Sequence, residues 1–311
     1  MTRSLMMFFG VLLVPFLIMG QSFTLTPLGV RGGLNEGNMS SYLIAPYQEK
    51  HYLCLDAGTL YSGIKTLVDD ESEIKYFLQN RIKAYYISHP HFDHLSGLII
   101  NSPLDSKKPI YAPKFVIDNF KHHIFNGTSW ANFGNEGTPP TLSKYQYQTT
   151  EFGTWHTIED LGLSIQAFPL SHDGISQSSG VLIRNNTSDY FLYLGDTGAD
   201  RMEQSTQLES LWKSIAPLIL SKQLKGIAIE CSYDNNRPNH LLFGHLTPKL
   251  LLEELTHLQK ISKTRLNGLK IVITHIKPKP HIVEQLKEEL NLLNPLGVEV
   301  IIAEQGKTIN L

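Results

Sequence analysis

The sequence predicts an α/β fold in which polar, metal-binding side chains directly follow β-strands. Segments rich in β-branched and aromatic residues alternate with segments whose apolar residues recur at helical spacing. The chain has 311 residues, 41% of them hydrophobic, so it can bury a large core as one domain or two. Its formal net charge of -2 leaves no concentrated basic surface, which weighs against a nucleic-acid partner and favours a small substrate.

The N-terminal segment, residues 1–20, predicts a secretory signal peptide. A single positive residue, Arg3, precedes an apolar run from Leu5 to Met19, and Gly20 is small enough to precede a cleavage site. The alternative is an uncleaved anchor, but the run is short for a span of about 20 residues. We therefore expect a periplasmic or secreted protein with one domain over residues 21–311 and no stable membrane span after cleavage.

The first predicted strands cover residues 21–27 and 41–45, and a glycine-rich loop joins them. No Lys-Ser/Thr pair or helix follows these glycines, so a long hairpin turn fits better than a phosphate-binding loop. A third strand, residues 51–56, ends in Asp56, which either orients a neighbouring metal ligand or caps a turn. Loosely helical spacing of apolar residues predicts a helix over residues 64–78, with its acidic stretch facing solvent.

Four metal-binding side chains fall within six residues, His89-Pro90-His91-Phe92-Asp93-His94. A strand over residues 82–88 precedes them and a helix starting at Leu95 follows, so they occupy a turn at the C-terminal end of a strand. His89 and His91 are expected to point toward one ion, and Asp93 and His94 toward a second. The motif therefore predicts two metal ions.

Residues 121–150 are rich in Asn, Gly, Thr and Pro and carry scattered aromatic residues. A loop of this length is uncommon in a compact domain unless it is functional or disordered. Its aromatic side chains either stack on a substrate ring from a lid or belong to a packed surface excursion. The sequence leaves both interpretations open.

Strands of the second half also end in candidate ligands. Residues 163–170 lead to His172, a hairpin of strands 180–184 and 190–194 leads to Asp196, and strand 269–274 leads to His275. The other predicted elements are a strand over 225–230, a helix over 247–261 capped at Thr247-Pro248, a helix over 281–293 and a final strand over 298–303.

The candidate ligands all offer oxygen or nitrogen donors: His89, His91, Asp93, His94, His172, Asp196 and His275. Such a set suits two borderline divalent ions, with zinc expected and manganese or iron as alternatives, and Asp196 is able to bridge them. The cysteines, Cys54 and Cys231, form no Cys-x-x-Cys motif, so they either pair or are buried free thiols.

The stretch from His89 to Pro103 resembles the signature of the class-II 3',5'-cyclic-nucleotide phosphodiesterases of the metallo-β-lactamase superfamily. Phe92 stands where leucine is usual, and every ligand is retained. Further similarity lies in residues 54–59, 230–232 and 243–248, so the resemblance covers nearly all of residues 24–311. It implies an αββα sandwich of two mixed β-sheets flanked by helices. It also implies a first metal on His89, His91 and His172, a second on Asp93, His94 and His275, and Asp196 as the bridge.

His245 and Glu230 look like the acid pair of related phosphodiesterases, in which a carboxylate holds a protonated histidine that donates to the departing sugar oxygen. The alternative is that His245 only caps the next helix. With Asp93 as a further catalytic residue, the resemblance implies hydrolysis of cyclic AMP, or of cyclic GMP, to the 5'-monophosphate.

Two other functions stay open at this point. One is a different exported hydrolase of the same fold that acts on a lactone, a sulfate ester or an RNA 3' end. The other is a metal-dependent binding protein, which would have no need of the acid pair. The oligomeric state is also open, with a homodimer among the alternatives.

Overall fold

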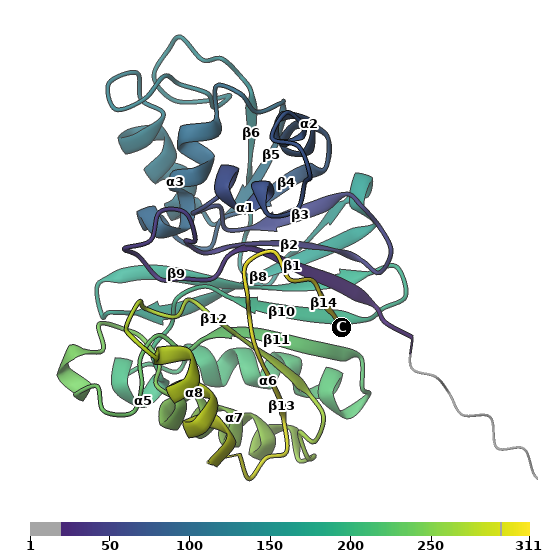
Figure 1. Cartoon of the computed structure of the whole chain (residues 1–311), viewed down its shortest axis with the longest axis vertical. Coiled ribbons are helices and arrows are strands. Elements are labelled where there is room, and N and C mark those ends of the chain that lie inside the picture. Colours follow the sequence, from purple (N-terminus) through teal and green to yellow (C-terminus); the bar gives the residue numbers. More distant parts are fainter. Residues whose placement is uncertain (1–19, 293) are drawn as a thin grey trace, which may run out of the picture.

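The computed structural model describes residues 20–292 and 294–311. Two seven-stranded β-sheets pack face to face, and helices cover the outer face of each (Figure 1). This four-layer αββα arrangement confirms the expected fold class. The predicted signal peptide lies outside the described residues, apart from Gly20. In the described ranges, none of the helices combines the length and apolar character that a membrane span requires.

The first sheet has the spatial order β14-β1-β2-β3-β4-β5-β6. Strands β14, β1, β2 and β3 pair antiparallel, whereas β3 to β6 run parallel, so the sheet is mixed. The glycine-rich loop joins β1 and β2 as the predicted hairpin connection. Its strands are β1 (Phe23–Gly29), β2 (Ser41–Pro46), β3 (Tyr52–Leu55), β4 (Ile82–Tyr86), β5 (Lys108–Ala112), β6 (Tyr145–Thr149) and β14 (Ile309–Asn310).

The second sheet has the order β13-β12-β11-β10-β9-β8-β7 and is also mixed. Strands β8 and β10 both pair antiparallel with β9, and β11 and β12 run parallel to β10, so four of these strands end at the same edge. Its strands are β7 (Trp155–Ile158), β8 (Leu163–His172), β9 (Ser176–Asn185), β10 (Tyr190–Leu194), β11 (Leu224–Glu230), β12 (Lys270–Thr274) and β13 (Glu299–Ile302).

Each sheet carries its own set of helices on its outer face (Figure 1). The first sheet is covered by α1 (Tyr61–Lys65), α2 (Glu73–Asn80), α3 (Phe92–Asn101) and α4 (Lys114–Asn119). The second sheet is covered by α5 (Asp200–Glu203), α6 (Gln207–Leu220), α7 (Pro248–Ser262) and α8 (Ile282–Leu292).

Three hydrophobic cores separate the four layers. The central core joins the sheets and includes Leu53 and Ala84 from the first sheet and Val181 and Val272 from the second. The two outer cores pack each sheet against its helices. Because most strands are buried on both faces, they are continuous apolar runs in the sequence, which is why they could be predicted.

The single helix predicted over residues 64–78 is wrong. Helix α1 ends at Lys65, and α2 begins only at Glu73. Between them, Asp70 Oδ1 accepts a hydrogen bond from Ser72 N at 2.8 Å. A short acidic side chain that bonds the backbone two residues on stabilises a turn rather than a helix. The acidic stretch is therefore a connection between two helices.

Two further differences concern boundaries. Helix α3 begins at Phe92 rather than at Leu95, so Asp93 and His94 belong to its first turn. The predicted last strand does not close the chain, because β14 follows it and pairs with β1. No helix was predicted for Gln207–Leu220, although α6 buries Leu211, Trp212 and Ile215 against the second sheet.

Candidate metal centre and acid pair

The candidate ligands come together at one edge of the sandwich. His89 and His91 follow β4 of the first sheet. His172 ends β8, Asp196 follows β10, and His275 follows β12, all in the second sheet. The shared direction of these second-sheet strands places their C-terminal ends side by side, where loops from both sheets meet.

The first group of ligands consists of His89, His91, His172 and Asp196. One donor atom from each lies within 4.8 Å of the others. The ring centroids of His89 and His91 are 4.6 Å apart, and those of His91 and His172 are 5.2 Å apart. All except the half-buried His91 are buried. Three imidazoles and a carboxylate are donors of the kind that zinc takes in proteins.

The second group consists of Asp93, His94 and His275, whose donor atoms also lie within 4.8 Å of one another. Asp93 and His94 sit in the first turn of α3, and Oδ2 of Asp93 is 3.2 Å from Nε2 of His275. Gly32 allows the His275 ring to lie close to the β1–β2 loop, because a Cβ there would stand 2.4 Å from Cε1 of that ring. The donors also form two overlapping groups, Asp56 with His89 and His94, and Asp196 with Glu230, His245 and His275. The division of the ligands between two ions therefore stays a prediction.

Asp196 lies between the two groups. Its Oδ1 is 3.2 Å from Nε2 of His94, and its Oδ2 is 3.2 Å from Nε2 of His275. The same Oδ2 is 3.7 Å from Nε2 of His89 and 3.9 Å from Nε2 of His172. One carboxylate thus faces ligands of both groups, as a bridging role requires.

Buried polar atoms at this centre fit a bound cation. Nε2 of His89, Nε2 of His94 and Oδ1 of Asp196 are buried and make no hydrogen bond among the described residues, although the last two atoms lie 3.2 Å apart. Leaving a buried polar atom unsatisfied costs about 1–3 kcal/mol. Metal coordination would remove that cost, and imidazole nitrogen with carboxylate oxygen suits zinc, manganese or iron.

Cys54 and Cys231 are both free and buried, so the alternative of a disulfide between them is wrong.

Asp56 orients one ligand of each group. Its Oδ2 accepts hydrogen bonds from Nδ1 of His94 at 2.8 Å and from Oγ of Ser88 at 2.7 Å. Oγ of Ser88 in turn lies 3.0 Å from Nδ1 of His89. Tyr193 donates to the same carboxylate at 2.6 Å. Of the two roles considered for Asp56, the structure supports orientation of metal ligands, since ligating imidazoles need an acceptor on their outer nitrogen.

His91 and His172 are also held from outside. Nε2 of His91 lies 3.2 Å from Oγ of Ser176, which donates to Oδ2 of Asp173 at 3.0 Å. This leaves Nδ1 of His91 for a metal. Nδ1 of His172 donates to the carbonyl oxygen of Gly244 at 3.0 Å. A side chain at Gly244 would place its Cβ 1.9 Å from the backbone nitrogen of Asp173, so this contact requires glycine.

His245 and Glu230 are in direct contact, with Nδ1 2.7 Å from Oε1. Glu230 also accepts a hydrogen bond from Oγ of Ser232 at 2.5 Å. Oγ of Ser232 lies 3.0 Å from Nδ1 of His275. One carboxylate therefore supports both His245 and a candidate metal ligand. Helix capping does not explain His245, because the side chain that accepts at the start of α7 belongs to Thr247.

The surroundings of His245 favour its charged form. Burial lowers the pKa of His245, but the Glu230 carboxylate raises it, Asp196 adds to the rise, and the net shift is upward. Because Nδ1 faces Glu230, Nε2 is the ring atom available to a substrate. A protonated imidazole with one free N–H has the form that a general acid needs.

Sequence reasoning gave no role to four residues that the structure places at the centre: Ser88, Ser176, Ser232 and Lys277. Nζ of Lys277 lies 3.8 Å from Oδ2 of Asp93. Three of them could have been found in the sequence only through their closeness to a site residue. Ser88 precedes His89, and Ser232 and Lys277 follow Glu230 and His275, respectively, by two positions. Ser176 becomes relevant only when the β8–β9 turn brings it to His91.

The aromatic residues of the 121–150 stretch do not face the candidate centre. Phe125, Phe133, Tyr145 and Tyr147 are buried in the core between the first sheet and its helices, and Trp130 packs against that core. The packed surface excursion is therefore the correct interpretation, and a stacking lid is not. The stretch also contains β6, which the sequence did not predict.

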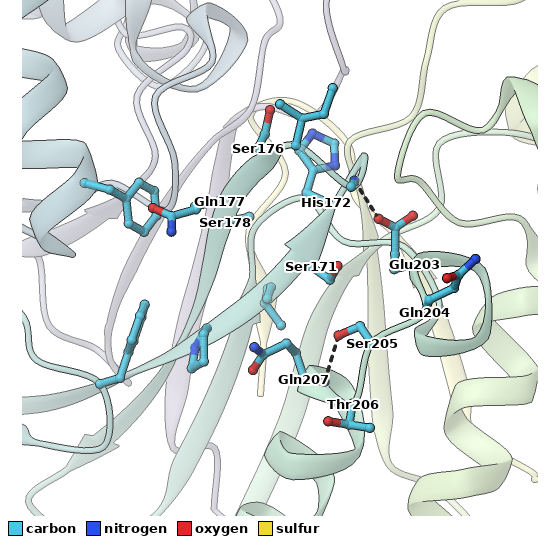
Figure 2. Close-up of a pocket in the computed structure, with 16 residues that line it drawn as sticks. Ser171, His172, Ser176, Gln177, Ser178, Glu203, Gln204, Ser205, Thr206 and Gln207 are labelled. Atoms are coloured by element: carbon cyan, nitrogen blue, oxygen red, sulfur yellow. Dashed lines mark hydrogen bonds between the residues drawn. The ribbon is translucent and has the colours of Figure 1, made fainter.

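Two clefts flank the candidate centre. The larger, about 490 Å³, begins at His172 and runs along β8 and β9 toward the connection between α5 and α6 (Figure 2). The smaller, about 390 Å³, lies on the side of Ser232 and Lys277. Both adjoin side chains of the candidate metal centre.

Comparison with known proteins points to one kind of enzyme. Residues 33–306 match the family model described as cAMP phosphodiesterases class-II. The chain is 38% identical to a 3',5'-cyclic-nucleotide phosphodiesterase of Aliivibrio fischeri over 93% of this chain and 92% of that protein.

Two solved structures share the fold. The crystal structure of unliganded yeast PDE1 is matched with a TM-score of 0.82 and 23% identity, over 94% of this chain and 100% of that one. The metallo-beta-lactamase fold protein YhfI from Bacillus subtilis is matched with a TM-score of 0.64 and 16% identity, over 93% of this chain and 100% of that one.

Proposed function

Because this chain belongs to the class-II 3',5'-cyclic-nucleotide phosphodiesterase family of the metallo-β-lactamase superfamily, we propose that it hydrolyses cyclic AMP to 5'-AMP at a dinuclear metal site, with cyclic GMP as a second substrate. The enzyme class follows from the family. The nucleotide, the number of ions and the role of each residue are our proposal. The alternative hydrolases of this fold, acting on lactones, sulfate esters or RNA, have no comparable support.

One observation supports the proposed site above all others. Asp196 lies close to ligands of both groups, 3.2 Å from His94 and from His275 and 3.7 Å from His89. The His245–Glu230 pair stands beside them, with Nδ1 of His245 3.9 Å from Oδ2 of Asp196. A phosphodiester needs activation of a nucleophile on one side of phosphorus and protonation of the leaving oxygen on the other. This edge of the sandwich offers side chains suited to both tasks.

We assign His89, His91 and His172 to one ion and Asp93, His94 and His275 to the other, with Asp196 between them. Zinc is the expected metal. When bound, a pair of divalent ions lowers the pKa of water toward about 7 and stabilises charge on phosphate oxygens. The protein's own part is to fix the ligands, and it does so through Asp56, Ser88, Ser176 and Ser232.

His245 is assigned to the leaving group. The 3' oxygen of the sugar is a poor leaving group while it carries developing negative charge. Nε2 of His245 would donate a proton to it, while Glu230 holds Nδ1 and stabilises the imidazolium. General acid catalysis of this kind contributes about 10²- to 10⁴-fold.

The site is tested by product analysis with purified protein. We expect cyclic AMP to yield 5'-AMP alone, resolved from 3'-AMP by chromatography, and a small RNA and a lactone to remain intact in parallel incubations. Formation of 3'-AMP would contradict the proposed orientation of the substrate. Hydrolysis of the lactone or the RNA in preference to cyclic AMP would contradict the proposed function.

Export is a separate proposal. It rests on the apolar run of residues 5–19 with Arg3 before it and Gly20 at its end. Fractionation of producing cells, followed by N-terminal sequencing of the mature protein, tests it. We expect the protein outside the cytoplasm, with a new N-terminus near Gln21.

A further inference from the structure

We propose that the larger cleft, between β9 and the α5–α6 connection, binds the purine base of the cyclic nucleotide. This inference rests on the proposed function. Figure 2 shows His172 and Ser176 at one end of the cleft and Thr206 and Gln207 at the other. The cleft thus opens directly from the candidate metal centre. Its volume, about 490 Å³, lies within the range of about 300–1,000 Å³ that is usual for small-ligand sites.

The reach of the substrate limits where its base can lie. In a 3',5'-cyclic nucleotide the phosphate and the base are attached to one ribose, and the leaving 3' oxygen must face His245. The rings of His245 and His172 are 4.9 Å apart, and His172 lines the cleft. The ring of Tyr233, which lines the smaller cleft beside Ser232, is 5.9 Å from that of His245. Two clefts therefore adjoin the surroundings of His245 and are candidates for the base.

Charge distinguishes the two clefts. The smaller cleft is lined by Arg237, Lys277 and Lys279. Lys279 is paired with Asp234 at 2.6 Å, and the guanidinium of Arg237 lies 4.4 Å from the centroid of the Tyr233 ring, so that aromatic face is covered. These contacts already engage one of the lysines and the aromatic ring of this cleft. The larger cleft has no lysine or arginine among the described residues that line it.

The lining of the larger cleft suits a purine. Gln177 lies on one side of it and Gln207 on the other (Figure 2), and each amide can donate and accept a hydrogen bond at the edge of a base. Phe115 and Phe152 also line it, and both continue with Gln177 into an adjoining hollow of about 280 Å³. Phe152 is 44% exposed, so part of its ring is free to stack on a base.

The turn at the mouth of the cleft is held in place. Oε2 of Glu203 accepts a hydrogen bond from the backbone nitrogen of Gly174 at 3.1 Å, which joins the β8–β9 turn to the opposite wall. Ile175 at the tip of this turn is 92% exposed and lines the cleft. This turn therefore offers an apolar side chain for contact with a bound base.

The test compares two variants on substrates with and without a base. Gln177→Leu and Phe152→Ala change partly or fully exposed side chains and should fold normally. For cyclic AMP we expect KM to rise about 2- to 10-fold in Gln177→Leu, as for loss of a hydrogen bond. In Phe152→Ala we expect a rise of roughly 5- to 100-fold, as for loss of base stacking. The kcat should change little, since such binding is the same in ground and transition states. KM for ribose 3',5'-cyclic phosphate, which keeps the sugar and the phosphate but has no base or other aromatic ring, should change far less.

Arg237→Gln, in the smaller cleft, is the matched control. We expect it to leave KM for cyclic AMP near the parent value. The proposal is overturned if both variants of the larger cleft leave that KM unchanged, or if they raise KM equally for ribose 3',5'-cyclic phosphate. A parent enzyme that cleaves bis-p-nitrophenyl phosphate but no cyclic nucleotide would overturn the proposed function, and the base site with it.

Discussion

Asp56 accepts a hydrogen bond from Nδ1 of His94 at 2.8 Å, although 38 residues separate them in the chain. Through Ser88 the same carboxylate also reaches His89, a ligand of the other group. A single buried acid on the β3 side therefore sets the orientation of one imidazole in each half of the candidate centre. Glu230 plays the equivalent part on the second sheet, where it serves His275 through Ser232 and His245 directly.

The first prediction concerns metal content. Since Asp196 lies between two groups of donors, the active protein should contain two ions per chain by elemental analysis. A strong chelator should abolish hydrolysis of cyclic AMP, and zinc or manganese should restore it. One ion or none in a fully active preparation would rule out the two-metal site.

The second prediction separates two buried acids. Asp196→Ala should abolish activity more completely than Asp56→Ala, because Asp196 faces ligands of both groups while Asp56 only orients them. Loss of an orienting partner typically costs about 10- to 100-fold in metal affinity or activity. Metal titration and steady-state kinetics check this, with circular dichroism as the folding control. Equal losses in two folded variants would contradict these roles.

The third prediction concerns the proton donor. His245→Ala should keep both ions and the affinity for cyclic AMP but lose about 10²- to 10⁴-fold in kcat. On bis-p-nitrophenyl phosphate, whose phenolate departs without help, the loss should be much smaller. The exposed His257 provides the control, because His257→Ala should match the parent enzyme on both substrates. Similar losses of His245→Ala on the two substrates would exclude the acid role.

The fourth prediction tests the serine that links Glu230 to His275. Ser232→Ala leaves Nδ1 of a buried imidazole without its acceptor, so metal affinity should fall by about 10- to 100-fold. Competition with a chromogenic chelator measures this without relying on turnover. Thr150→Val is the control, because the buried Thr150 hydroxyl has no partner among the described residues. An unchanged affinity in Ser232→Ala would remove Ser232 from the support of the metal centre.

The fifth prediction concerns stability away from the site. Lys108 and Asp105 form a buried ion pair at 2.7 Å, and Tyr85 and Tyr145 also donate to the Asp105 carboxylate. Asp105→Ala leaves Lys108 buried without its counter-charge, and should lower the free energy of unfolding by about 3–5 kcal/mol.

Urea denaturation of the metal-loaded protein measures the loss. The control removes an acid from an exposed pair, since Asp118→Ala breaks only the contact with Lys114 and should cost less than about 1 kcal/mol. Similar effects of the two substitutions would contradict the prediction.

Elements with strong local signals were predictable from the sequence alone. Buried strands such as Leu224–Glu230 are apolar runs, and Thr247-Pro248 marks the start of α7 through an oxygen acceptor and a fixed φ. Four candidate ligands were found because they cluster within residues 89–94, and His172, Asp196 and His275 because each lies at the end of a predicted strand. The prediction of one helix over residues 64–78 was wrong because apolar residues recur there only loosely at helical spacing. The hydrogen bond from Ser72 to Asp70 stabilises a turn between two shorter helices instead.

Which of these side chains are in contact depends on the tertiary structure. Asp56 was ambiguous until the parallel pairing of β3 and β4 placed it beside Ser88, and Ser176 has no local signal at all. The aromatic residues of the 121–150 stretch were equally compatible with a lid by sequence, but the structure buries most of them in the core. Long-range contacts depend on sheet order and loop packing, which a one-dimensional pattern of polar and apolar residues does not encode.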